Sequence, residues 1–154
     1  MPLVKSVNSK SETSANNTIA AERSGNSKEK SGVHKKILYI EDDKASRDVI
    51  TRFLLNKYDI VTKDSADESL QIVNETKFDA ILMDINLGNG LNGIEVSQLI
   101  KKEPGYQNIP IIAVTAFASD DDKTEFLSKG MTHYISKPFR QNELLDLLNN
   151  VFAE

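Results

Sequence analysis

The sequence contains no cysteine, and it lacks any apolar run long enough to cross a bilayer. Without cysteine there is no disulfide framework, which is compatible with a reducing cytoplasm. A membrane-spanning helix needs about 18 or more consecutive apolar residues. The opening stretch, MPLVKSVNSKSETSANN, also lacks the continuous apolar core of a secretory signal. These absences predict a soluble, cytoplasmic protein that does not associate with a membrane.

Positive charge is scarce in most of the chain. Residues 1–35 hold six Lys and Arg against three Asp and Glu, which leaves 13 basic and 20 acidic residues in 36–154. The two segments therefore carry net charges of +3 and −7. Neutralising phosphates supplies most of the affinity of nucleic-acid-binding proteins, and an acidic domain without a basic stripe is poorly suited to that task. We expect no direct binding to nucleic acid.

The composition also divides the chain into two regions. Residues 1–34 are rich in Ser, Asn and Lys and have no sustained hydrophobic period, so ordering them would cost more entropy than burial returns. This pattern predicts a flexible, disordered N-terminal tail. Residues 35–154 show the regular patterning of one folded domain, and they are numerous enough to bury a core without metals or cross-links.

Within the predicted domain, short apolar runs rich in β-forming residues alternate with segments of helical period. Turn residues and helix-capping residues separate them, such as Ser65 and Glu68, which have the spacing of a capping box. Acidic residues at 120–122 open the fourth helical segment, where they complement a helix amino terminus. The predicted strands are 36–40, 58–63, 78–83, 109–115 and 132–136, and the predicted helices are 45–57, 65–76, 92–102, 119–130 and about 140–153.

Alternating strands and helices with short connections predict an α/β fold with a parallel sheet covered by helices on both faces. An eight-fold barrel would need roughly twice as many residues. The five pairs instead fit a doubly wound, flavodoxin-like sheet with strand order 2-1-3-4-5. In such sheets the ligand sites lie at the carboxyl ends of the strands, so function is expected at that edge.

Acidic and other reactive side chains follow the first, third, fourth and fifth predicted strands. Taken singly, each acid is more often a turn or helix-cap residue. Together they are expected to converge, because the first, third and fourth strands are neighbours in this strand order. These residues are Glu41, Asp42 and Asp43 after the first strand, Asp84 after the third, Thr115 after the fourth and Lys137 after the fifth.

Clustered carboxylates repel one another, and protons or a cation must relieve that cost. Mg²⁺, or Mn²⁺ in its place, is the expected cation because it is a hard ion that prefers oxygen ligands, and the predicted cluster holds no histidine. The Lys137 ammonium and the Thr115 hydroxyl are then suited to bind the oxygens of a phosphoryl group carried by Asp84. The residues thus favour Asp84 as a nucleophile.

Four segments carry a family resemblance: ILYIEDD, ILMDINL, IIAVTAFA and THYISKPF. They resemble the signature blocks of the receiver domain of bacterial two-component response regulators, over about residues 35–153. The resemblance implies that a sensor histidine kinase or a histidine phosphotransfer protein phosphorylates Asp84. It further implies roles for single residues: metal binding by Glu41 (often through water), Asp42, Asp84 and the backbone carbonyl of Asn86, phosphoryl contacts from Thr115 and Lys137, and a switch aromatic at Tyr134.

Several further expectations follow from this resemblance. Asp43 is expected to start the first helix, and His133 is given no role. The chain departs from the family in having Gly88 where proline is usual, and in a loop at 84–93 that is one residue longer than the commonest version. With no output domain after the last helix, it resembles a stand-alone, chemotaxis-regulator-like receiver. A downstream protein is expected to bind the face formed by the fourth helix, fifth strand and fifth helix.

Two other functions compete with a signalling switch that is not an enzyme. A haloacid-dehalogenase-like phosphatase also uses an aspartate nucleophile, but it needs a second aspartate two residues later, where this sequence has Asn86. A scaffold that binds partners without phosphorylation is the second alternative. The resemblance to receivers implies that Asn86 and Phe117 flank the approach of the hydrolytic water, and Phe117 cannot hydrogen-bond that water. A long-lived phosphoryl state is therefore expected.

Overall fold

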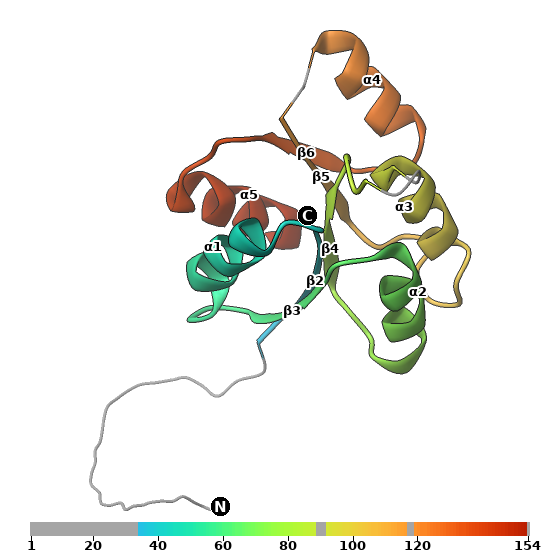
Figure 1. The fold of residues 1–154 in the computed structure, drawn as a ribbon, viewed down its shortest axis with the longest axis horizontal. Coiled ribbons are helices and arrows are strands. Elements are labelled where there is room, and N and C mark those ends of the chain that lie inside the picture. Colours follow the sequence, from blue (N-terminus) through green and yellow to red (C-terminus); the bar gives the residue numbers. More distant parts are fainter. Residues whose placement is uncertain (1–33, 89–91, 117–118, 154) are drawn as a thin grey trace, which may run out of the picture. The chain divides into compact units, whose positions relative to one another are not determined.

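The computed structural model describes residues 34–88, 92–116 and 119–153. Residues 1–33, which are all but the last residue of the flexible tail predicted at 1–34, lie outside this range, as does Phe117. Strands and helices alternate along the described part of the chain (Figure 1). The strands are β2 (Lys36–Ile40), β3 (Asp59–Lys63), β4 (Ala80–Asp84), β5 (Ile111–Thr115) and β6 (His133–Ser136), and the helices are α1 (Lys44–Leu54), α2 (Ala66–Glu75), α3 (Gly93–Lys101), α4 (Asp120–Ser128) and α5 (Gln141–Ala153).

The strands form one parallel sheet in the order β3-β2-β4-β5-β6, so the predicted doubly wound fold is confirmed. Every residue of the central strands β4 and β5 is buried, whereas the edge strands β3 and β6 are partly exposed. This difference arises because helices cover both faces of the central strands. The strand ends that carry the candidate site residues therefore lie at one edge of the sheet.

Each face of the sheet has its own hydrophobic core. Alternate residues of a strand point to opposite faces, so Leu38 and Ile40 of β2 pack on one side while Ile37 and Tyr39 pack on the other. Helices α1 and α5 cover the Tyr39 face, and α2, α3 and α4 contribute to the core of the opposite face (Figure 1). The two faces of the sheet are thus covered by different helices.

The predicted elements are confirmed, with shifts at their ends. The first and fourth helices end two or three residues earlier than predicted, at Leu54 and Ser128. After α4, Gly130 has a φ of 99°, a left-handed conformation that stops the helix and suits glycine. The apolar pattern of the last helix predicts six core residues in α5, of which Leu144, Leu148 and Val151 are buried and three are only partly buried. Those three are Leu145, Leu147 and Phe152.

Side-chain caps fix where the helices begin at the carboxyl edge of the sheet. Asp43 caps α1, as predicted, by accepting a hydrogen bond of 2.9 Å from the Ser46 amide. Ser65 caps α2 by accepting one of 3.2 Å from the Glu68 amide. Asn92 and Ser119 cap α3 and α4 in reciprocal capping boxes. Each cap replaces hydrogen bonds that the first turn of a helix cannot make internally.

No helix in the described ranges combines the length and the apolar character that crossing a membrane requires. This finding agrees with the absence of long apolar runs in the sequence.

Gly93 allows α3 to begin directly against the end of β4. Its amide donates a hydrogen bond of 2.8 Å to the Ile85 carbonyl. A side-chain carbon at residue 93 would collide with the Asp84 carbonyl oxygen and would lie 2.8 Å from Cγ of Met83. Because a backbone atom is the nearest obstacle, the start of α3 and the end of β4 could not both keep their positions.

Gly93→Ala is therefore expected to lower the free energy of unfolding by about 2–3 kcal/mol, the cost of overpacking a rigid site. Urea unfolding monitored by circular dichroism measures the change. Gln98→Ala, at an exposed position of the same helix, is the matched control and should stay within about 0.5 kcal/mol of the wild-type chain. Equal stability of the two variants would contradict this prediction, because it would mean that the β4–α3 junction can shift to accommodate a side chain at residue 93.

Candidate functional site

The parallel register brings the predicted site residues to one cleft. Glu41 and Asp42 follow β2, Asp84 ends β4 and Thr115 ends β5. Lys137 follows β6, and its amide donates a hydrogen bond of 2.7 Å to the Thr115 carbonyl. All five residues line a cleft of about 380 Å³ at the carboxyl edge of the sheet. The structure thus assembles side chains that are up to 96 residues apart in sequence.

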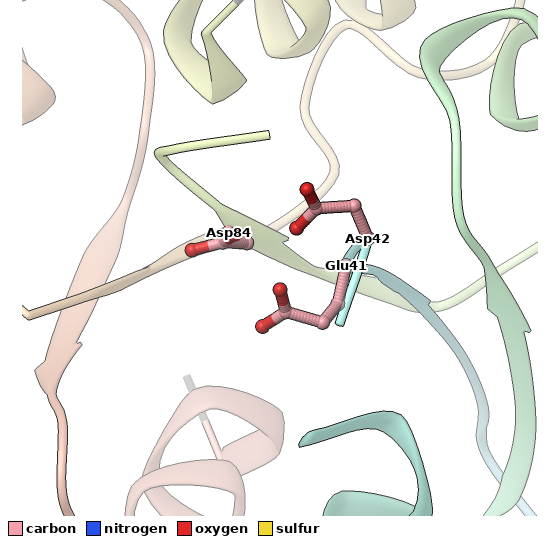
Figure 2. A group of neighbouring side chains, drawn as sticks. All are labelled: Glu41, Asp42 and Asp84. Atoms are coloured by element: carbon pink, nitrogen blue, oxygen red, sulfur yellow. The ribbon is translucent and has the colours of Figure 1, made fainter. Parts of the chain in front are cut away.

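Three of the carboxylates in this cleft lie close together. Glu41, Asp42 and Asp84 each offer an oxygen within 4.8 Å of the others. Figure 2 shows these carboxylates gathered where β4 ends beside the segment that follows β2. Glu41 and Asp84 are buried, whereas Asp42 is exposed. A set of oxygen donors that is partly open to solvent, with no sulfur or imidazole, fits a hard divalent cation such as Mg²⁺.

Lys137 provides the positive charge next to the buried acids. Its Nζ lies 2.9 Å from Oε1 of Glu41 and 3.5 Å from Oδ1 of Asp84. The lysine side chain is 29% exposed, whereas the Glu41 and Asp84 side chains are 2% and 7% exposed. An ion pair at such depth is screened less by water than a surface pair, so the ammonium strongly influences both carboxylates.

Glu41 is held by more contacts than the sequence alone indicated. Its Oε1 also accepts a hydrogen bond of 2.8 Å from the Tyr39 hydroxyl, and its Oε2 accepts one of 3.2 Å from the Asp43 amide. Its backbone carbonyl accepts a hydrogen bond of 2.8 Å from the Arg47 guanidinium. The sequence analysis did not identify Tyr39 as a partner of Glu41. The spacing of the two residues could have indicated it, because side chains two residues apart in an extended chain point to the same face.

The pKa values of the acids differ because their partners differ. Burial, followed by the nearby Glu41 carboxylate, raises the pKa of Asp84 to about 7. Burial also acts to raise the pKa of Glu41, but hydrogen bonds from Lys137 and Tyr39 outweigh it, so that pKa is lowered. The pKa of Asp42 is raised by partial burial and by Glu41. Burial acts to lower the pKa of Lys137, but Glu41 and Asp84 outweigh it and raise that pKa.

The remaining predicted residues occupy different places. Asn86 lines the cleft and forms an isolated antiparallel bridge with Asn92. Tyr134 is half-buried in β6, and Nζ of Lys123 lies 5.0 Å from the centre of its ring. Phe117 is outside the described residues, so its predicted position in the cleft is not described. Nδ1 of His133 lies 2.9 Å from Oγ1 of Thr132 rather than in the cleft.

Helix α4 contributes two acids to the cleft that sequence reasoning did not place there. Asp122 and Glu125 line it together with Phe126. The run of acids at 120–122 predicts only a complement to the helix amino terminus, and Asp122 does accept hydrogen bonds from Ser119 in the capping box. The sequence could not indicate that this helix face also borders Asp84, because that depends on how α4 packs on the sheet.

A parallel sheet of this strand order, with three carboxylates and a lysine at its carboxyl edge, defines the receiver class of α/β proteins. A family model for the response regulator receiver domain matches residues 37–149, and the chain belongs to this family. Receiver domains are signalling switches of two-component systems rather than classical enzymes, and they bind Mg²⁺ in an acidic pocket.

Curated relatives agree with this membership. The chain is 32% identical to the response regulator protein FleR of Pseudomonas aeruginosa, across 73% of this chain and 24% of FleR. It is 37% identical to the transcriptional regulatory protein YvrH of Bacillus subtilis, across 70% of this chain and 45% of YvrH. The chain thus spans about a quarter to a half of the length of these relatives.

Solved structures show the same fold. Chemotaxis protein CheY4 of Vibrio cholerae is 27% identical and matches with a TM-score of 0.74, covering 77% of this chain and 99% of CheY4. The receiver domain of a sensor histidine kinase from Pseudomonas aeruginosa is 29% identical, with a TM-score of 0.72, covering 79% of this chain and 100% of that domain. That domain was solved with a magnesium ion coordinated in its active-site cleft.

The raised pKa of Asp84 predicts how stability depends on pH when metal is removed. Since this pKa rises from 3.8 to about 7 on folding, the folded protein keeps a proton that the unfolded chain loses between about pH 4 and pH 7. The free energy of unfolding should therefore fall across this window as the pH rises, by about 2–4 kcal/mol. Urea unfolding in EDTA at a series of pH values measures this change.

Asp84→Asn should flatten this profile and should be more stable than the wild-type chain at about pH 8. The matched control is Asp67→Asn, which changes an exposed carboxylate in the first turn of α2 and should keep the wild-type profile. Identical profiles for the wild-type and Asp84→Asn proteins would contradict the proposed titration of Asp84.

Proposed function

We propose that this chain is a Mg²⁺-dependent switch controlled by phosphorylation of Asp84, with Mn²⁺ able to replace Mg²⁺. The donor is the phosphohistidine of a sensor histidine kinase or of a histidine phosphotransfer protein. The observation that carries this proposal is the position of the Asp84 carboxylate, which lies in the cleft with its Oδ1 3.5 Å from Nζ of Lys137 and two further carboxylates beside it. This arrangement combines a nucleophile, a cation site and a group for the phosphoryl oxygens.

The metal would be held by Glu41 through water, by the carboxylates of Asp42 and Asp84, and by the backbone carbonyl of Asn86. Mg²⁺ would neutralise the acids and the developing charge on the phosphoryl oxygens. The present donor set supports this assignment, since Glu41, Asp42 and Asp84 offer oxygens close together and Asn86 lines the same cleft. Gly88, with a φ of 73°, lies so close to Asp42 that a side-chain carbon at residue 88 would be 3.2 Å from Oδ2 of Asp42.

In the transfer step, a carboxylate oxygen of Asp84 attacks the phosphorus atom in line with the bond to the donor histidine. The new oxygen–phosphorus bond forms as the nitrogen–phosphorus bond breaks, and the histidine nitrogen keeps the electron pair and regains a proton from water. Lys137 and Thr115 would bind the phosphoryl oxygens, and both side chains line the cleft beside Asp84. The protein acts mainly by positioning and charge stabilisation.

The two competing functions are less well supported. A haloacid-dehalogenase-like phosphatase would need an acid two residues after the nucleophile, and Asn86 cannot give and take a proton. A scaffold independent of phosphorylation would not require Lys137 and three carboxylates to converge on one cleft. With acetyl phosphate and Mg²⁺, a stable one-to-one adduct favours the switch, sustained phosphate release favours the phosphatase, and no adduct favours the scaffold.

Asp84→Asn should abolish the adduct while keeping the fold, because the amide is not a nucleophile but matches the carboxyl in shape. Intact-protein mass spectrometry after treatment with acetyl phosphate and Mg²⁺ measures the adduct. Asp67→Asn is again the matched control and should label like the wild-type chain. Labelling of Asp84→Asn at the wild-type rate would rule out Asp84 as the acceptor.

The proposed output is a change in the face formed by α4, β6 and α5, which would bind a downstream protein. In this proposal Thr115 moves toward the phosphoryl group and Tyr134 turns inward into the released space. The half-buried position of Tyr134 on the edge strand supports it, as does Lys123 of α4, whose Nζ lies over the Tyr134 ring. Because a cation over an aromatic ring is worth about 0.5–1 kcal/mol at exposed sites, this contact would hold Tyr134 only weakly.

A phosphoryl mimic should therefore shift the resonances of Tyr134, Lys123 and other residues of this face. The measurement compares amide chemical shifts of the full chain with and without beryllofluoride and Mg²⁺. Changing the ratio of active to inactive conformations from 1:99 to 99:1 requires about 5.5 kcal/mol of differential stabilisation. Charge-assisted hydrogen bonds to one phosphoryl group can approach this value. Shift changes confined to the neighbourhood of Asp84 would contradict the proposed output.

The lifetime of the phosphoryl group is a separate part of this proposal. Asn86 would orient the hydrolytic water through its amide, whereas Phe117 would offer that water no hydrogen bond. Residues at these two positions would then give slow self-dephosphorylation. Support comes from Asn86, which lines the cleft, and from the residue type at position 117.

A further inference from the structure

Tyr39 is a buried tyrosine whose hydroxyl donates a hydrogen bond to Glu41, one of the residues that line the cleft. The residue is the last but one of β2, is 0% exposed and packs on the α1 and α5 face of the sheet. Strand β2 pairs with neighbours on both sides, so its backbone has little freedom to move. The Tyr39 hydroxyl therefore has a fixed position, from which it donates a hydrogen bond of 2.8 Å to Oε1 of Glu41.

The same oxygen of Glu41 is also the acceptor for Lys137. Two donors thus converge on Oε1, the neutral Tyr39 hydroxyl at 2.8 Å and the Lys137 ammonium at 2.9 Å. Lys137 is nearer to Glu41 than to Oδ1 of Asp84, which lies 3.5 Å from its Nζ. In the proposed reaction, however, Lys137 must bind an oxygen of the phosphoryl group on Asp84.

This shared oxygen creates a conflict that Tyr39 can relieve. Glu41 is 1% exposed, and a buried carboxylate oxygen that loses its partner pays the full cost of desolvation. If Lys137 were the sole donor to Oε1, it would be held at Glu41 and its transfer to the phosphoryl group would be opposed. With the Tyr39 hydroxyl on Oε1, the oxygen stays hydrogen-bonded when Lys137 moves away.

We propose that the Tyr39 hydroxyl is a positioning group for phosphorylation, which holds the Glu41 carboxylate so that Lys137 can leave it for the phosphoryl group on Asp84. This inference rests on the function proposed above. Tyr39 touches neither the donor nor the reacting atoms and acts through Glu41.

Tyr39→Phe tests this inference by removing one oxygen atom. At saturating Mg²⁺, the rate of adduct formation from phosphoramidate should fall about fivefold, equivalent to roughly 1 kcal/mol of barrier. The dissociation constant for Mg²⁺, measured by calorimetry without a phosphoryl donor, should stay within about twofold of the wild-type value. Tyr39 is not one of the proposed metal ligands, and the substitution leaves all of their oxygen atoms in place. A general loss of structure would instead both slow adduct formation and raise the dissociation constant for Mg²⁺.

Tyr106→Phe is the matched control. Tyr106 is also a buried tyrosine, 1% exposed, whose hydroxyl donates to the Thr76 carbonyl at 2.8 Å and accepts from the Phe78 amide at 3.2 Å. None of these contacts involves the cleft residues. This variant should lose stability like Tyr39→Phe, or more, and yet form the adduct at the wild-type rate.

A double-mutant cycle with Glu41→Gln identifies the route of the effect. If Tyr39 acts through the Glu41 carboxylate, Tyr39→Phe should cause little further slowing in the Glu41→Gln background. Effects that multiply would contradict the inference, as would a Tyr39→Phe rate within twofold of the wild-type rate. Circular dichroism measures the folded fraction of each variant, and the rates are compared per folded molecule, so that a loss of stability in Tyr39→Phe does not count as slowing.

The outcomes separate this inference from the function on which it rests. A wild-type chain that forms no adduct would contradict the proposed function and this inference together. An adduct on Asp84 whose rate does not depend on Tyr39, or depends equally on Tyr106, would contradict the inference alone.

Discussion

The burial of Glu41 beside Asp84 is the constraint on which the rest of the site depends. Two carboxylates withdrawn from water and held close together repel each other, and each is costly to ionise. Lys137 offsets this cost for Glu41 through a short ion pair and for Asp84 through a longer one. Asp84 is the less well compensated of the two, so it gains most from a cation or a proton.

The sheet produces this constraint through its register. Asp84 pairs with Val114 and Thr115 pairs with Ser136. The carboxyl ends of the neighbouring strands β4, β5 and β6 therefore lie side by side at the same edge of the sheet. Buried apolar residues fill the four remaining positions of β4, and Asp84 stands at the end of this strand, which opens into the cleft. The hydrophobic core on both faces therefore holds a destabilising cluster of charge in place, a trade of stability for function.

Close packing at the β4–α3 junction and hydrogen bonding beneath the cleft serve the same purpose from opposite sides. Gly93 brings the start of α3 against the Asp84 backbone, while Tyr39 reaches Glu41 from the α1 and α5 core. Both are buried residues with little freedom, so the acids are positioned by rigid parts of the fold. The side of the cleft formed by α4 differs, because its acids, Asp122 and Glu125, are at least partly exposed.

The sequence by itself determined the alternation of strands and helices, the Asp43 cap and the strand-end positions of Asp84, Thr115 and Lys137, because hydrophobic period and capping are local properties. Only the tertiary structure decided that Lys137 and Tyr39 share one oxygen of Glu41, and that α4 adds acids to the cleft. Those contacts depend on strand register, helix packing and side-chain rotamers across as many as 96 residues of chain. No local sequence pattern predicts these contacts, because residues so far apart in the sequence meet only when the hydrophobic cores on both faces of the sheet are packed.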